Sequence, residues 1–275
     1  MSVAPLQPAN GHQQEYTIVF DDVAIAFDEN VVLDGISFRL HKGETKMLLG
    51  VAGSGKSTIL KLALGLLKPD RGSIWVLGQD VTRMKEEELF DLRRRIGMVF
   101  QESALFDSAT VRENVAYRLI EEHVPADETE RRVREALRFV ELEHTLDLFP
   151  AELSGGMRRR VAIARAIVAQ PEVLLYDSPT GGLDPVTSTT IIELVVKQRD
   201  VYHTSALLVT HRLQDAFTMA THYFDTRANE MRPLPDKKVN LETTFIILRD
   251  GKVIFDGTTL ELARSKDEYI REYIS

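Results

Sequence analysis

The chain has 275 residues, of which 44% are hydrophobic and 28% are charged, and its formal net charge is −8. This length is enough for one large domain or two small ones, and the composition is that of an ordinary globular protein. The acidic balance and the scattered, mixed-sign charges argue against a nucleic-acid binder that works through a basic surface.

No stretch of the sequence predicts a membrane span, a secretory leader or a disulfide framework. No apolar run approaches the ~18 residues that a bilayer crossing requires. Residues 1–15 are polar and contain Pro5, Pro8 and Gly11, which predicts a flexible tail rather than a leader peptide. The absence of cysteine suits a cytoplasmic protein, because disulfides are rare in that compartment.

Two strands are predicted after this tail. Residues 16–27 alternate in part between apolar and polar side chains, and residues 31–40 carry a second strand-like pattern. We therefore expect an antiparallel pair with its turn at 28–30. Phe27 ends the first strand, and Val32 lies near the start of the second. From the pattern alone, Phe27 is more typical of a core residue, because aromatic strand residues usually pack inward.

A phosphate-binding loop is indicated by the stretch Gly50-Val51-Ala52-Gly53-Ser54-Gly55-Lys56-Ser57-Thr58, which fits the pattern G-x-x-x-x-G-K-[ST]. An apolar run at 47–49 predicts a buried strand before it, and residues 58–64 predict a helix after it. Glycines let backbone N–H groups converge on phosphate oxygens, and the helix N-terminus adds partial positive charge. Lys56 is expected to reach the outer phosphates, and Ser57 to offer its hydroxyl to a magnesium ion.

The next part of the chain predicts an α/β core interrupted by a helical segment. The expected elements are a turn at 68–72, a short strand at 73–78, a surface helix at 84–95 and a buried strand at 96–100 that ends at Gln101. Residues 110–140 are helical and highly charged, with one apolar stripe. They predict a helical subdomain at about 102–165, whose charge run is expected to be a solvated face.

A second glycine-rich helix N-terminus follows, at Leu153-Ser154-Gly155-Gly156-Met157. Ser154 is a good N-cap, and the pattern after it is strongly helical. Such a terminus suits a second anion, although as an isolated motif it is a weak signal. The arginines at 158–160 are more typical of a solvated helix face than of a patch for phosphate or acidic lipid.

Two further buried strands end in polar side chains. The apolar run at 173–177 ends in Asp177, which a parallel sheet places at its carboxyl edge, where ligands bind. An acid at this position is typical of magnesium coordination in P-loop enzymes. Residues 180–185 predict a turn before another helix. The strand at 206–210 then delivers His211 to the same edge, although a lone histidine there is more often structural than functional.

The order of these pieces resembles the ATP-binding cassette (ABC) family of transport ATPases over residues 16–257. The resemblance is carried by the phosphate-binding loop, Gln101, the run from Leu153 to Met157, Asp177, Leu183-Asp184 and His211. It implies an α/β fold of the P-loop NTPase class, with a mixed-sheet core, N-terminal antiparallel strands and an inserted helical subdomain. It also implies ATP and Mg²⁺ as cofactors, and ATP hydrolysis coupled to transport.

The same resemblance implies roles for individual residues. Phe27 looks like the aromatic residue that stacks on adenine, with Val32 lining the same pocket. Gln101 looks like the glutamine that touches magnesium and the attacking water, and His211 looks like the switch histidine on the γ-phosphate. The implied magnesium ligands are Ser57, Gln101 and Asp177.

In this family two cassettes pair head to tail, so that the signature of one caps the ATP held by the P-loop of the other. The residues implied in trans are Ser154, Gly155, Gly156, Met157 and Asp184. A homodimer of this kind would drive separate membrane permease subunits, which Gln101 and the helical subdomain would contact. The chain would then lie on the cytoplasmic face of a bacterial inner membrane, reach the membrane only through the permease and bind no nucleic acid.

Two features narrow the resemblance. Met157 replaces the glutamine usual at the end of the signature, and the stretch 100–117 resembles the ATPases of Mla/Mce-type lipid transport systems. Such systems move phospholipids or other lipids across the cell envelope. The alternative is the ATPase of another import system, such as one for polar amino acids.

One departure from the family concerns catalysis. Ser178 follows Asp177 at the position where the family has a glutamate that polarises the attacking water. A serine hydroxyl does not take that proton at neutral pH, and general-base catalysis is worth ~10²–10⁴ in rate. We therefore expect slow hydrolysis, a substitute base among Glu102, Asp184 and His211, or a weakly active cassette that binds ATP without useful turnover.

A second departure is the polar segment at 227–244, where the family usually has a shorter connection. It contains Pro233 and Pro235 and is expected to be a surface loop or a hairpin. Residues 258–275 predict a C-terminal helical tail that packs on the domain or on a neighbour.

Overall fold

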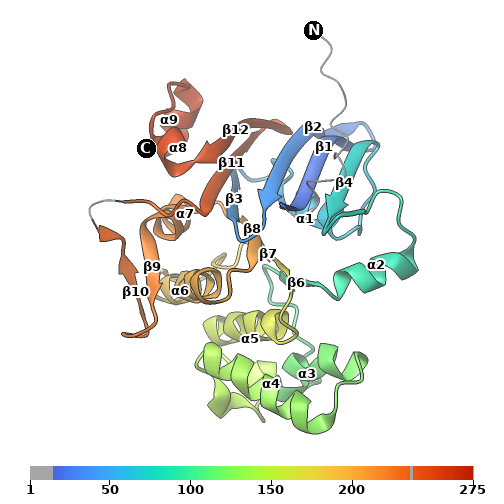
Figure 1. Ribbon diagram of the computed structural model, residues 1–275, viewed down its shortest axis with the longest axis vertical. Helices are drawn as coiled ribbons and strands as arrows, with labels where there is room; N and C mark the ends of the chain where they lie inside the picture. Colours follow the sequence, from blue (N-terminus) through green and yellow to red (C-terminus); the bar gives the residue numbers. More distant parts are fainter. Residues whose placement is uncertain (1–14, 236–237, 275) are drawn as a thin grey trace. The chain divides into compact units, whose positions relative to one another are not determined.

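The structure, a computed structural model, describes residues 15–235 and 238–274, which divide into two compact units (Figure 1). The first unit is assembled from the described residues up to Arg93, residues 205–213 and the residues from Leu241 onward. The second unit comprises residues 94–204 and 214–240. Of the predicted N-terminal tail, residues 1–14 lie outside the described residues. Among the described helices, none is both long enough and apolar enough to cross a membrane.

The first unit contains a mixed sheet built on the strand that precedes the phosphate-binding loop. Its strands lie in the order β12-β11-β3-β8. β11, β3 and β8 run parallel, and β12 runs antiparallel to β11. The bounds are β3 (Thr45–Gly50), β8 (Ser205–Val209), β11 (Thr243–Arg249) and β12 (Lys252–Thr258). Every residue of β3 is buried, as expected for a strand covered on both faces.

An antiparallel sheet in the order β2-β1-β4-β5 completes the strands of this unit. The bounds are β1 (Tyr16–Phe27), β2 (Asn30–His41), β4 (Arg71–Val76) and β5 (Gln79–Asp80). The predicted N-terminal pair is confirmed, with Phe27 opposite Asn30 at the turn. Phe20 and Phe38 stack with their ring centroids 4.7 Å apart, and burial of each such ring contributes roughly 1.5–3 kcal/mol relative to exposure.

The helices of the first unit are short. They are α1 (Lys56–Ala63), α2 (Glu86–Arg93), α8 (Thr259–Ala263) and α9 (Glu268–Ile274). Thr258 ends β12 and starts α8 through a capping box with Glu261, which satisfies two amide donors that a helix start leaves free. Leu262 and Ile270 are 1% and 2% exposed, so the predicted C-terminal tail packs on its own unit.

The second unit contains the predicted helical subdomain. Its helices are α3 (Val111–Glu121), α4 (Ala126–Phe139) and α5 (Gly155–Ile167), with 3₁₀ turns at Glu143–Thr145 and Pro150–Glu152. Thr110 begins α3 with a capping box to Glu113. The fully buried Asn114 accepts a 2.8 Å hydrogen bond from the Phe106 amide and donates a 3.0 Å bond to the Ala109 carbonyl. These bonds fix the loop that leads into the subdomain.

The remaining elements of the second unit include a parallel pair of strands, β6 and β7. The elements are β6 (Ile96–Val99), β7 (Val173–Asp177), α6 (Pro185–Tyr202), α7 (Leu213–Thr221), β9 (His222–Asp225) and β10 (Glu230–Pro233). The segment at 227–244 was predicted to be a surface loop or a hairpin. It begins between the two strands of the hairpin formed by β9 and β10, so that β9 precedes the segment in the sequence. Arg199, 2% exposed, donates a 2.8 Å bond to the His222 carbonyl and pairs with Asp200 at 2.7 Å. Asp200 in turn accepts from the Phe224 amide, so the hairpin is fixed to α6. Residues 236–237 lie outside the described residues.

Candidate functional site

The predicted phosphate-binding loop leaves β3 at Gly50 and enters α1 at Lys56. Gly50 has a φ of +148°, and a Cβ there would lie 2.5 Å from the Leu248 carbonyl oxygen. Gly55, the N-cap of α1, has a φ of +93°, and a Cβ there would lie 2.5 Å from Leu33 Cδ2. Both positions therefore require glycine. The resulting backbone path ends at a helix N-terminus, whose free N–H groups suit an anion.

Lys56 holds its charge inside this loop. Its side chain is largely buried, at 8% exposed. Its Nζ lies 2.9 Å from the Gly50 carbonyl oxygen, 2.7 Å from the Val51 carbonyl oxygen and 3.2 Å from Ser54 Oγ. Phosphate oxygens carry full negative charge and are stronger acceptors for an ammonium group than neutral carbonyls are. The loop thus holds the Lys56 ammonium group with its N–H donors directed at oxygen atoms of the loop itself.

The C-terminal helix α9 is anchored to the start of the same loop. The Gly50 amide donates a 3.0 Å hydrogen bond to the Tyr273 hydroxyl, and burial raises the pKa of Tyr273. Tyr273 stacks on Tyr269 with ring centroids 6.1 Å apart, and the Arg249 guanidinium lies 4.2 Å from the centre of the Tyr269 ring. Tyr273 carries no local sequence signal, because its partner in the loop is distant in the sequence.

We expect Tyr273→Phe to lower the stability of the first unit by about 1–2 kcal/mol. The substitution keeps the ring but leaves the Gly50 amide without its acceptor, and a buried unsatisfied donor costs about that much. The measurement is urea unfolding followed by the fluorescence of Trp75, the one tryptophan of the chain, which lies on β4 of the same unit.

Tyr269→Phe is the matched control, because it removes a hydroxyl from the stacked neighbour and leaves the bond to Gly50 in place. Equal unfolding midpoints for the two variants would show that the hydroxyl bond does not stabilise the loop.

The two residues implied in adenine binding lie in the first unit. Phe27 is 44% exposed at the end of β1. The prediction from the strand pattern alone, that Phe27 is a core residue, is therefore wrong. Val32 lies against the phosphate-binding loop, since a Cβ on Gly55 would come within 3.3 Å of Val32 Cγ1. An exposed aromatic ring and an apolar side chain beside the loop are the groups that a nucleobase would need.

His211 follows the strand adjacent to the P-loop strand. β8 pairs in parallel with β3, with Val209 opposite Leu48, and the Thr210 amide donates a 3.2 Å bond to the Leu48 carbonyl. The exposed His211 therefore lies at the carboxyl edge from which the loop also departs. In open α/β sheets, ligands bind at this edge.

In the second unit, Gln101 follows β6 and Asp177 is the last residue of β7, the adjacent parallel strand. β6 pairs with β7, with Val99 opposite Tyr176, so both polar residues leave the sheet at the same edge. Gln101 is exposed and Asp177 is half-buried. Their amide and carboxylate oxygens are the hard ligands that magnesium prefers, and the Ser57 hydroxyl in the first unit is a ligand of the same kind.

A buried arginine joins the loops that carry these residues. Arg159 of α5 is 5% exposed and donates to the Ser178 and Pro179 carbonyls at 3.0 and 2.9 Å. The same guanidinium donates to the Gln101 carbonyl and, at 3.2 Å, to Ser103 Oγ. Burial lowers the pKa of Arg159. The expectation of a solvated arginine face is wrong at this position, where one side chain cross-links the loops after β6 and β7.

Ser178 lies directly after Asp177, at the position where a general base is expected. Its φ is +48°, it is 8% exposed, and its carbonyl accepts from the Gly181 amide at 2.9 Å. Two residues later, the Thr180 hydroxyl donates to the buried carboxylate of Asp215. Asp215 was not among the predicted residues, because an acid inside a helical pattern carries no distinctive signal.

The signature and Asp184 form an exposed pair of helix N-termini. Ser154 Oγ accepts from the Met157 amide at 3.2 Å and caps α5, and Asp184 caps α6 by accepting from the Thr187 amide at 3.0 Å. Hydrogen bonds from Thr187 lower the pKa of Asp184. A Cβ on Gly156 would lie 2.4 Å from Thr187 Cγ2, so the two helices begin side by side. The structure thus groups the implied trans residues on one surface.

The chain is similar to several known proteins. Residues 33–181 match the family model described as ABC transporter. The chain is 37% identical over 262 residues to protein TRIGALACTOSYLDIACYLGLYCEROL 3, chloroplastic, of Arabidopsis thaliana, covering 92% of this chain and 71% of the relative. It is 32% identical over 247 residues to the intermembrane phospholipid transport system ATP-binding protein MlaF of Haemophilus influenzae, covering 90% and 85%. The methionine import ATP-binding protein MetN of Carboxydothermus hydrogenoformans is 40% identical over 182 residues, covering 66% and 54%.

Solved structures show the same fold. cbiO1 of Clostridium perfringens, described as part of the ABC transporter complex cbiONQ, superimposes with a TM-score of 0.77 at 28% identity, covering 94% of each chain. A dimeric ATP-binding cassette in a post-hydrolysis state, bound to ADP and phosphate, gives a TM-score of 0.72 at 29% identity, covering 88% of this chain and 98% of that one.

Proposed function

The chain belongs to the ABC transporter family and is an ATP-hydrolysing cassette. We propose that it drives a bacterial lipid transporter of the Mla/Mce type. The observation that carries the proposal is the extent of the match to MlaF, which spans 90% of this chain. The methionine import relative has a higher identity but matches only 66%. The lipid-related matches therefore account for parts of the chain that the import relative leaves unmatched.

The nucleotide is ATP, and the proposed contacts follow the site described above. Lys56 and the loop amides from Gly50 to Thr58 bind the phosphates, while Phe27 stacks on the adenine beside Val32. Ser57, Gln101 and Asp177 are the proposed ligands of a magnesium ion, which would neutralise charge on the transferring phosphate. His211 contacts the γ-phosphate, and Gln101 orients the attacking water.

The working form is proposed to be a head-to-tail homodimer. Ser154, Gly155, Gly156, Met157 and Asp184 would cap the nucleotide of the partner subunit. This proposal is supported by the two exposed helix N-termini, which suit an anion, and by the Val186 side chain beside them, which is 78% exposed. The dimeric ADP-bound cassette among the structural neighbours supports it by analogy.

The membrane permease is proposed to contact an apolar surface of the helical subdomain. Phe106, Tyr117 and Ile120 are 44%, 49% and 55% exposed, and the ring centroids of Phe106 and Tyr117 lie 4.9 Å apart. Adjacent exposed apolar side chains of this kind mark interaction sites. Contact here and at Gln101 would transmit nucleotide-driven closure to the permease, and would hold the chain at the cytoplasmic face of the inner membrane.

The proposal is tested with the complex that contains this chain and its permease subunits, reconstituted in liposomes with a fluorescent phospholipid. We expect Mg-ATP to drive phospholipid transfer between the liposomes and acceptor vesicles, and we expect no transfer by the complex that carries Lys56→Met. Turnover stimulated by L-methionine and indifferent to phospholipid would instead assign the chain to an import system.

A further inference from the structure

One buried side chain of α5 is bonded to two loops at the edge of the β6-β7 sheet. The first loop, residues 101–106, follows β6, and the second loop, residues 178–183, follows β7. A terminal nitrogen of Arg159 donates to the Ser178 carbonyl at 3.0 Å, and the other terminal nitrogen donates to the Gln101 carbonyl. A single guanidinium group therefore holds the backbone of both proposed hydrolytic positions.

This guanidinium group is buried among neutral oxygen atoms. Arg159 is 5% exposed, and its hydrogen bonds go to backbone carbonyls and to the Ser103 hydroxyl. Burial lowers the pKa of Arg159, and the negative charge of Glu102 partly opposes this change. A buried charge is costly, but arginine is the side chain that presents five N–H donors in one plane. That planar fork is what allows one residue to bond to two loops at once.

Both loops contain backbone conformations that need outside support. The φ angles of Ser103, Ala104 and Ser178 are +63°, +49° and +48°. Residues other than glycine rarely adopt such angles, and these conformations persist where the surrounding structure fixes them. Arg165, also on α5, donates to the Ser103 and Ala104 carbonyls at 2.9 and 2.7 Å. The first loop is therefore held by two arginines of α5, and Arg159 extends the support to the second loop.

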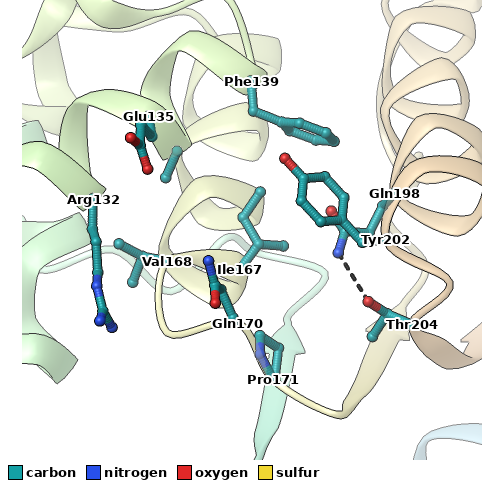
Figure 2. Close-up of a pocket in the computed structure, with 11 residues that line it drawn as sticks. Arg132, Glu135, Phe139, Ile167, Val168, Gln170, Pro171, Gln198, Tyr202 and Thr204 are labelled. Carbon is teal, nitrogen blue, oxygen red and sulfur yellow. Dashed lines mark hydrogen bonds between the residues drawn. The ribbon is translucent and has the colours of Figure 1, made fainter. Parts of the chain in front are cut away.

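The helix that carries these arginines is packed within its own unit. Its last residue, the buried Ile167, lines a pocket together with Phe139 and Tyr202, the last residues of α4 and α6. Figure 2 shows the rings of Phe139 and Tyr202 together on one side of this pocket, with their centroids 5.8 Å apart. Ser154 caps the other end of α5. One helix thus carries the proposed trans-capping serine at its start and supports both loops along its length.

We propose that Arg159 is a positioning residue for ATP hydrolysis, which ties the two loops to α5 so that Gln101 and Ser178 take their places together. The inference rests on the role proposed above for Gln101. Arg159 acts through the backbone of the loops, and the phosphate-binding loop belongs to the other unit. Its replacement should therefore change the rate of hydrolysis and leave the affinity for ATP unchanged.

The link between the loops is tested by hydrogen–deuterium exchange on the full chain without nucleotide. Each loop is closed by a backbone hydrogen bond, at 3.0 Å from the Ser103 amide and at 2.9 Å from the Gly181 amide. Arg159→Lys keeps the charge and loses the planar fork. We expect it to speed the exchange of both amides at least tenfold, because both loops lose the same anchor. Faster exchange of one amide alone, or of neither, would overturn the proposal.

Two other arginines of α5 are matched controls. Arg165→Lys loosens the first loop and should speed the exchange of the Ser103 amide alone. Arg160→Lys, at a side chain that donates to the Val140 carbonyl, should change neither amide. If Arg159→Lys does not fold, the natural chain decides the question. Exchange of both amides should then respond identically to low urea, since the loops open as one unit, and different responses would overturn the link.

Steady-state turnover tests the positioning role. Arg159→Lys should lower the rate at saturating Mg-ATP by ~10²-fold, the loss that a 1 Å misplacement causes. The dissociation constant of ATP, measured by calorimetry in EDTA, should be unchanged, and Arg160→Lys should alter neither quantity. A fall in ATP affinity that parallels the fall in rate would overturn the positioning role. Normal turnover in Gln101→Ala would instead refute the role proposed for Gln101, without affecting the link that exchange measures.

Discussion

Lys56→Met should reduce steady-state Mg-ATP turnover of the purified chain by at least ~10²-fold, since loss of one preorganised donor to a reacting group costs ~10²–10³ in rate. The Lys56 ammonium is the cation held inside the phosphate-binding loop, within 3 Å of the Gly50 and Val51 carbonyls. Methionine keeps the length of the side chain and removes the charge. The loss should appear both in nucleotide affinity and in the rate at saturating ATP, because the charge acts on bound phosphates and on the transition state.

The matched control is Lys61→Met, at an exposed position in the last turn of the same helix. It removes an identical charge from α1 without touching the loop, and should leave turnover unchanged. Phosphate release is measured with both variants at several ATP concentrations. If Lys56→Met retained normal affinity and turnover, the phosphate site would have to lie elsewhere in the chain.

Ser178→Glu should raise turnover by ~10²–10⁴-fold, the range that general-base catalysis contributes. Ser178 directly follows Asp177 at the end of β7, and its carbonyl is fixed by Arg159 and by the Gly181 amide. A glutamate there would carry its carboxylate from a backbone position that is already rigid. The serine hydroxyl has no comparable affinity for a proton at neutral pH.

Ser178→Gln serves as the control, because it has the size of glutamate and lacks the base. The three chains are compared as purified proteins, and then with the permease subunits present. A rise in the glutamate variant alone would show that the natural chain hydrolyses ATP slowly for want of a base. Equal rates in all three would show that another group takes this role, with Glu102, Asp184 and His211 as the candidates by motif position.

The elements were predictable where the chain carries local signals. The apolar run before Gly50 and the cap at Ser154 each mark a boundary through residues that are neighbours in sequence. The structure confirms a strand ending at Gly50 and helices beginning at Val111 and Gly155. The motif residues were predicted for the same reason, since most of them end or follow a strand or lie at the start of a helix.

The side chains that support the site were not predictable in this way. Arg159 looks like any arginine on a charged helix, and its bond to the Gln101 carbonyl spans 58 positions. The bond from Gly50 to Tyr273 spans 223 positions. For Phe27 the strand pattern predicted a buried position, and this was wrong. Its place beside a turn leaves the ring exposed. Periodicity reports which face a residue occupies and carries no information about distant partners.

The first unit is built from three separate stretches of the chain. Its strands are therefore synthesised at different times. β3 emerges from the ribosome before β8 and β11, its two neighbours in the sheet, have been made. At ~5–20 residues per second, the delay between β3 and β8 is on the order of 10–30 s. Most of the second unit is made in that interval, so it is able to fold first.

Throughout this delay the apolar side chains at 47–49, all fully buried in the finished protein, have no sheet to join. Such an unpaired apolar strand is prone to aggregate and is a target for chaperones. The residues of the phosphate-binding loop are therefore synthesised early, whereas the strands that flank β3 in the sheet are synthesised late. A ribosome that stalls before residue 205 would leave β3 without either of its sheet neighbours.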